Sequence, residues 1–141
     1  MTHISFLHGA ADRLQATVHW LHQAWAERQP VLVYVPDEAT AQQLDRALWT
    51  QPALSFTPHC AIDSPLAAET PIILTPQLET PPQVQCLLNL SNALPASFSR
   101  FEQMIEIVST DDRDRLPARE RFKIYRDHGC VIDSRDISGG V

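Results

Sequence analysis

The side chains with the clearest chemical potential lie in a cationic segment close to the C-terminus. Arg119, Lys123 and Arg126 are spaced i, i+4 and i+7, so on a helix they form one basic stripe with Phe122 beside it. Such a stripe can grip a short acidic segment or a C-terminal carboxylate, while the ring lines an apolar pocket. The same spacing suits a solvated helix face on which neighbouring acidic residues balance the cations, and spacing alone leaves both interpretations open.

Two large aromatic residues, Trp49 and Phe56, mark a second candidate site. Leu48 belongs to the apolar face of its helix, which turns Trp49 towards the flank, and Phe56 follows in a loop bounded by prolines. Aromatic residues are enriched at the centres of protein interfaces. The pair is therefore either a docking patch for another protein or a cap on the core, and the sequence favours neither.

Patterns that would indicate catalysis, a metal or a nucleotide do not occur. His19 and His22 are spaced i, i+3, but no H-E-x-x-H pattern supplies the third ligand that a metal needs. Asp111 and Asp112 lie at a predicted helix start, where acidic residues complement the helix dipole. The chain has four glycines, with neither G-x-G-x-x-G nor G-x-x-x-x-G-K-[ST], and no serine lies in a G-x-S-x-G context. We therefore expect no catalytic residues, no metal and no cofactor.

Composition narrows the class of protein further. The formal net charge of −6 argues against extended contact with nucleic acid, because phosphate neutralisation needs a basic surface. The cations are unevenly placed, with six of the 11 Lys and Arg residues between positions 111 and 128. Cys60, Cys86 and Cys130 are widely spaced and favour neither a disulfide framework nor a zinc site. No apolar run reaches the roughly 20 residues that a bilayer requires, and no signal peptide is evident, so we expect a cytoplasmic protein without a membrane partner.

The N-terminal part of the chain alternates strand and helix patterns. Strands are predicted over His3–Leu7 and Val31–Val35. Helices are predicted from Asp12 to about Glu27 and from Asp37 onwards, each with an aspartate as N-cap. This order predicts an α/β layer architecture, and because no linker interrupts the chain we expect one domain over residues 1–141.

The rest of the chain is predicted from prolines and apolar runs. Seven of the 11 prolines lie in residues 51–82, which excludes long regular elements there. A final helix is expected from about Asp111 to His128, ended by Gly129. Residues 136–141 are expected to form a frayed tail. The remaining predicted elements are strands over Pro71–Leu74, Gln85–Leu90, Met104–Val108 and Cys130–Ile132, and a helical turn over Ser97–Phe101.

Three runs of residues, taken in order, resemble one known family over most of the chain. They are Asp45-Arg46-Ala47-Leu48-Trp49, Ser55-Phe56-x-Pro58-His59 and Ala118-Arg119-Glu120-Arg121-Phe122-Lys123-x-Tyr125-Arg126 before a Gly. The family is the chi subunit of bacterial DNA polymerase III holoenzyme, and the last run is the most specific. The resemblance implies a single three-layer, Rossmann-like α/β domain with a mostly parallel sheet and a long C-terminal helix, without catalytic activity or a bound dinucleotide.

The resemblance also implies a partner for the basic stripe. In the family, chi links the clamp-loader complex to single-stranded DNA-binding protein (SSB) by gripping the acidic, Phe-ending C-terminal tail of SSB. Carried over, Arg119, Phe122, Lys123 and Arg126 would form the tail pocket. Charge reversal at Lys123 is then expected to abolish tail binding and leave the fold intact. The family often has Tyr where Phe122 stands, so a hydroxyl hydrogen bond seen elsewhere would be missing here.

A second surface of the family binds the psi subunit, or a helicase-like repair protein in its place. Phe56 matches the key aromatic of that surface, and Trp49 lies near enough to help. DNA would then be reached only through SSB. The alternative is a small Rossmann-like nucleotide- or nucleic-acid-binding protein, against which the missing glycine loop counts. A third interpretation is a purely structural subunit whose basic helix is buried against a partner.

Overall fold

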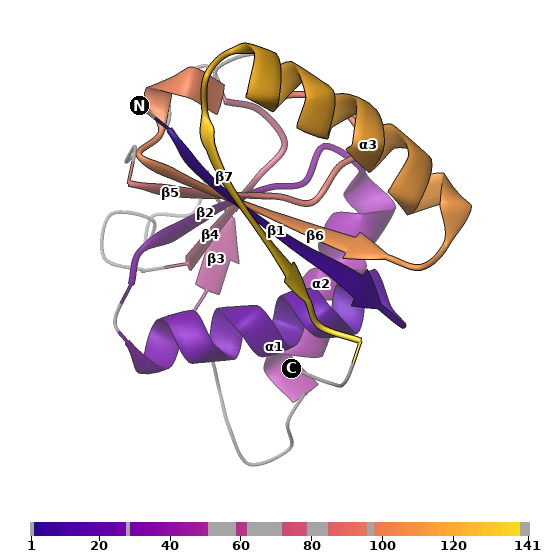
Figure 1. Cartoon of the computed structure of the whole chain (residues 1–141). Coiled ribbons are helices and arrows are strands. Elements are labelled where there is room, and N and C mark those ends of the chain that lie inside the picture. Colours follow the sequence, from indigo (N-terminus) through magenta and orange to yellow (C-terminus); the bar gives the residue numbers. More distant parts are fainter. Residues whose placement is uncertain are drawn as a thin grey trace.

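Seven parallel strands form one sheet in the computed structural model, which describes residues 2–27, 29–50, 59–61, 72–78, 85–95 and 98–138. The strand order is β3-β4-β2-β5-β6-β1-β7, and every pairing is parallel (Figure 1). The strands are β1 His3–Ala10, β2 Val31–Tyr34, β3 His59–Ala61, β4 Ile72–Thr75, β5 Cys86–Asn89, β6 Gln103–Ser109 and β7 Val131–Asp136. The helices are α1 Arg13–Ala26, α2 Glu38–Thr50, α3 Asp112–Asp127 and the short 3-10 helix η2 Phe98–Arg100.

Helices cover both faces of this sheet, so the molecule has three layers. α1 and α2 lie on one face and α3 on the other (Figure 1). Successive strand residues point to opposite faces: in β5, Leu88 packs in the core under α1 and α2, whereas Leu87 packs in the core under α3. The predicted three-layer α/β architecture is confirmed, and the sheet that was predicted to be mostly parallel is parallel throughout its described strands. No helix in the described ranges combines the length and the apolar character that crossing a membrane requires.

Aspartates begin the helices as the sequence predicted. The Asp12 carboxylate accepts a hydrogen bond from the Gln15 N–H at 3.1 Å at the start of α1. Asp37 does the same for the Thr40 N–H at 3.1 Å before α2. These contacts satisfy backbone donors that the first helical turn leaves free. Gly129, with φ of +77°, follows the end of α3, as expected for a residue in the left-handed region.

Four local predictions were wrong, three of them at the edges of the sheet. Strand β3 was not predicted, because its three residues lie within a proline-rich stretch. The last strand was predicted as Cys130–Ile132 but runs to Asp136, and the frayed tail therefore does not begin at residue 136. Ile137 is 8% exposed and its N–H donates to the His8 carbonyl at 2.8 Å. The short apolar run predicted only the first two of the six residues of this strand, because β7 is mostly exposed and is positioned by its pairing with β1.

The first strand continues past the point where it was predicted to end. β1 runs to Ala10, with a register shift against β6 between Leu7 and Ala10. Gly9 makes this possible: its φ is +84°, and a Cβ there would lie 2.8 Å from the Asp136 carboxylate. The irregular end of β1 therefore lies against the end of β7.

Candidate functional site

A buried ion pair fixes α3 on the sheet. Arg121 is 3% exposed and Glu106, on β6, is 0% exposed. The Arg121 Nε and Nη2 groups donate to the two carboxylate oxygens of Glu106 at 3.0 and 2.9 Å. The Tyr125 hydroxyl adds a hydrogen bond to Glu106 at 2.7 Å. Burial, and then the charge of Glu106, raise the pKa of Tyr125 above its usual value, so this hydroxyl stays a donor.

This pair sets the rotation of α3, and sequence reasoning missed it. The helical period offered a signal, because Arg121 lies three residues after Ala118 and four before Tyr125, both of which are buried. With Ala118, Arg121 and Tyr125 turned inward, Arg119 is left exposed and Phe122 is half-buried at the border. The buried pair therefore positions the residues that were predicted to bind a partner.

A cavity of about 360 Å³ lies between α3 and the strands β1, β6 and β7. Its apolar lining includes Phe6, Val108, Ala118 and Phe122. The rings of Phe6 and Phe122 meet edge to face with centroids 5.3 Å apart, so the Phe122 side chain is held against a buried ring. This cavity is open to one apolar side chain of a partner.

Cations line the same cavity. Arg115 and Arg119 are one helical turn apart and both contribute to the wall, with His8 from β1. Arg115 also pairs with Asp112 at the start of the helix. Among the described residues, none accepts a hydrogen bond from the Arg119 guanidinium. The cavity thus combines an apolar floor with guanidinium donors that can hold a carboxylate.

The predicted set is only partly brought together. Arg119 and Phe122 line the cavity, whereas Lys123 and Arg126 do not. The Lys123 ammonium lies 3.4 Å from a Glu120 carboxylate oxygen, and Arg126 Nε lies 3.6 Å from Asp127, all on exposed side chains. Arg115, which the sequence analysis did not single out, takes their place at the cavity. Its position four residues before Arg119 was the available signal.

Of the aromatic pair Trp49 and Phe56, only the backbone of residue 49 belongs to the described part of the structure. Residue 49 belongs to α2, on the face of the sheet opposite to α3, but its side chain lies outside the described part of the structure. Phe56 lies wholly outside the described residues. Residue 49 and the cavity beside α3 therefore belong to different layers.

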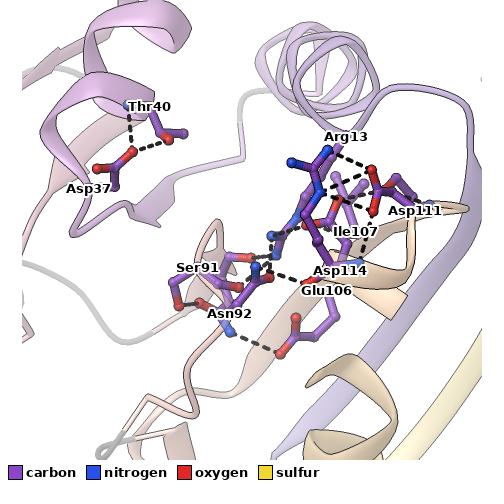
Figure 2. Close-up of polar contacts among 12 residues, drawn as sticks. Arg13, Asp37, Thr40, Ser91, Asn92, Glu106, Ile107, Asp111 and Asp114 are labelled. Atoms are coloured by element: carbon purple, nitrogen blue, oxygen red, sulfur yellow. Dashed lines mark hydrogen bonds and ion pairs between the residues drawn. The ribbon is translucent and has the colours of Figure 1, made fainter. Parts of the chain in front are cut away.

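The carboxyl ends of the strands hold a second polar cluster. α1 follows β1 and α3 follows β6, and these adjacent strands send their helices to opposite faces. Open α/β sheets bind ligands at such a switch point. Figure 2 shows that Arg13 fills it. Its guanidinium donates to the carbonyls of Ile107 and Ser91 at 2.8 Å, and to the Asn92 side chain at 2.8 Å.

Carboxylates occupy the helix starts around Arg13. Burial lowers the pKa of Arg13, and Asp114 lies 3.6 Å from it. Hydrogen bonds from Thr40 lower the pKa of Asp37, and those from Arg113 lower the pKa of Asp111 to about 2. Fixed anions therefore stand where a nucleotide phosphate would meet helix N-termini. In the described ranges, no three His, Cys, Asp or Glu residues group closely enough to hold a metal ion.

Comparison with known proteins gives one consistent family. The family model described as DNA polymerase III chi subunit, HolC, matches residues 1–133. The chain is 32% identical over 113 residues to the DNA polymerase III subunit chi of Escherichia coli (strain K12). The matched residues make up 79% of this chain and 77% of that relative. It is 31% identical over 127 residues to the subunit of the same name from Pseudomonas aeruginosa, with 89% and 87% covered.

Proposed function

The chain belongs to the DNA polymerase III chi subunit family, and on that premise we propose that it is a non-catalytic replication adaptor. It binds the acidic C-terminal tail of SSB in the cavity beside α3, and its other face links SSB to the clamp-loader complex. One observation carries the proposal: an apolar cavity edged by two arginines, on a chain of net charge −6. An acidic partner is attracted to this place and to few others on such a surface.

The dimensions of the cavity suit one end of a peptide. A space of about 360 Å³ takes one large side chain and leaves the remaining tail outside. The terminal Phe ring lies against Phe6 and Phe122, where aromatic pairs are favourable. Arg115 and Arg119 then receive the terminal carboxylate and the acidic residues next to it.

Lys123 and Arg126 act at longer range in this proposal. Both are exposed on α3 outside the cavity, and both already have an acidic neighbour. Exposed charges outside a binding cavity steer an acidic peptide towards it, and salt screens this attraction. Their contribution is therefore smaller than that of Arg119, whereas the family resemblance led to the expectation that charge reversal at Lys123 abolishes tail binding.

The test is a titration of a fluorescent peptide that copies the SSB C-terminus, followed by anisotropy. Arg119→Glu and Arg115→Glu are each expected to weaken binding at least tenfold, since each loses charge-assisted hydrogen bonds of about 1.5–3 kcal/mol. Lys123→Glu, a matched charge reversal on the same helix, is expected to weaken binding less, and its effect should shrink as salt is added. A peptide without its terminal Phe should bind poorly to every variant.

Two outcomes would count against this assignment. Failure of the wild-type chain to bind the peptide removes the adaptor proposal. Binding that survives Arg119→Glu but is lost in Lys123→Glu moves the site to the outer face of α3.

The second surface is proposed at Trp49 and Phe56, with the psi subunit or another replication or repair protein as partner. α2, which carries Trp49, and α3 are on opposite faces of the sheet, so the two partners can bind at once. Trp49→Ala and Phe56→Ala are expected to leave the affinity for the SSB peptide unchanged in the same titration. Loss of peptide binding in either variant would contradict a separate second surface.

A further inference from the structure

Strand β7 is the last strand of the sheet order, and one of its two sides has no partner strand among the described residues. It pairs with β1 on the other side, and Figure 1 shows it in gold in front of β1. Five of its six residues are exposed. Val131 is 44% exposed and is one of two exposed large hydrophobic residues in the described part of the chain. An edge strand of this kind is a template for pairing with another strand.

The hydrogen bond after β7 shows which backbone groups face outward. The Ile137 N–H donates to the His8 carbonyl of β1 at 2.8 Å. Because the backbone groups of successive residues alternate between the two sides of a strand, residues 131, 133 and 135 also face β1. Ile132, Ser134 and Asp136 therefore direct their N–H and C=O groups to the open edge.

The charges on this strand are complementary to themselves. Charged side chains commonly protect an edge against pairing, but here Asp133 and Arg135 stand two residues apart with opposite signs. We propose that β7 pairs antiparallel with β7 of a second copy of this chain, about a two-fold axis through Ser134. Ser134 then exchanges hydrogen bonds with its own copy, and Ile132 does so with Asp136 of the second copy.

In this register, each Asp133 lies directly opposite Arg135 of the second copy. These are non-hydrogen-bonded positions, where opposing side chains approach most closely, and the symmetry makes two such ion pairs. An axis at Asp133 would instead oppose two carboxylates, and an axis at Arg135 would oppose two guanidinium groups. Of these three registers, only the Ser134 axis pairs opposite charges.

The surface beside β7 has room for the contact. A groove of about 700 Å³ borders the strand on the face that carries α1, and Asp133 and Arg135 line it together with Trp20. No described helix fills this space over β7. Asp136, which meets Ile132 of the second copy, already accepts a hydrogen bond from the Ser138 N–H at 2.8 Å. The pairing leaves that carboxylate with its local partner, and because Ser134 also lines the cavity beside α3, it places the second copy next to that cavity.

The experiment is sedimentation equilibrium of the full chain over roughly a hundredfold range of concentration. The weight-average mass is expected to rise from 15.9 kDa towards twice that value. Asp133→Arg and Arg135→Asp each place like charges opposite one another, so each variant alone should stay at the mass of one chain. An equal mixture of the two variants restores opposite charges across the axis, and its mass should rise again. Circular dichroism confirms that each variant is folded.

Three results would overturn the proposal. The first is a wild-type mass that stays at 15.9 kDa throughout. The second is association of either single variant as strong as that of the wild type, which would place the contact elsewhere. The third is a mixture that remains at the mass of one chain while the wild type associates.

Discussion

At the scale of single residues, Glu106 is the side chain on which most of the α3 contact depends. Its carboxylate accepts hydrogen bonds from Arg121, Tyr125 and Asn89, all from buried side chains. Arg121→Met removes two of these bonds and leaves a buried anion with neutral donors. We expect the free energy of unfolding in urea to fall by about 3–5 kcal/mol, because an unpaired buried charge is costly.

Arg119→Met is the matched control for this prediction. It is the same substitution two residues away on the same helix, at an exposed side chain, so a change within about 0.5 kcal/mol is expected. The two variants should also separate in function: Arg119→Met stays folded and binds the acidic peptide weakly. Equal stability losses in both variants would show that the Glu106 pair does not hold α3.

At the scale of elements, α3 contains a proline, and the backbone hydrogen bond that this proline cannot make is replaced by one from a neighbouring loop. Pro117 has no N–H to donate to the Arg113 carbonyl one turn earlier. The Asn92 side chain donates to that carbonyl instead, at 3.2 Å, and its oxygen accepts from Arg13 at 2.8 Å. The loop after β5 thereby connects α1 with α3.

Pro117→Ala is therefore expected to raise the free energy of unfolding by about 1–2 kcal/mol. This is less than the roughly 3 kcal/mol that separates Pro from Ala inside a helix, because Asn92 already serves the freed carbonyl. Asn92→Ala should destabilise the wild type more than it destabilises the Pro117→Ala chain, in which a backbone N–H is restored. Thermal unfolding of the four chains measures this coupling. Additive effects would mean that Asn92 acts only through Arg13.

The sequence predicts the elements that neighbouring residues determine, and it misses parts of those that depend on pairing with a distant strand. Helix starts at Asp12 and Asp37 and the buried strand β2 follow from local caps and apolar runs, and these predictions were confirmed. β7 was predicted only in part, since five of its six residues are exposed, so it has little apolar alternation, and it is held by pairing with β1.

Likewise, some residues of the candidate site follow from local spacing, and others depend on the order of the strands. Helical spacing placed Arg119 and Phe122 together and, read one turn earlier, includes Arg115. His8 and Ser134 join the cavity only because β1 and β7 are neighbours in the sheet. That adjacency comes from long-range topology, so no local pattern reveals it.

At the scale of the whole molecule, the fold has the layers of a dinucleotide-binding domain, and this raises the alternative function again. The switch point at the strand ends is filled by Arg13 and lined by the carboxylates of Asp37 and Asp114, with Arg113 already paired to Asp111. A phosphate entering there meets fixed anions and must displace a guanidinium from several carbonyl partners. The cavity beside α3, in contrast, offers guanidinium donors that face solvent.

A thermal-shift comparison therefore tests the molecule as a whole. NAD, NADP and ATP at millimolar concentration are expected to leave the melting temperature unchanged. The SSB tail peptide at about a hundred times its Kd is expected to stabilise the chain by about 2.7 kcal/mol, or roughly 5–10 °C for a domain of this size. A comparable rise in melting temperature with a nucleotide would mean that a phosphate displaces the Arg13 guanidinium. Nucleotide binding at the carboxyl ends of the strands would then be supported. If only the peptide raises the melting temperature, and Arg119→Glu abolishes that rise, then the binding site lies on the face of the sheet that carries α3.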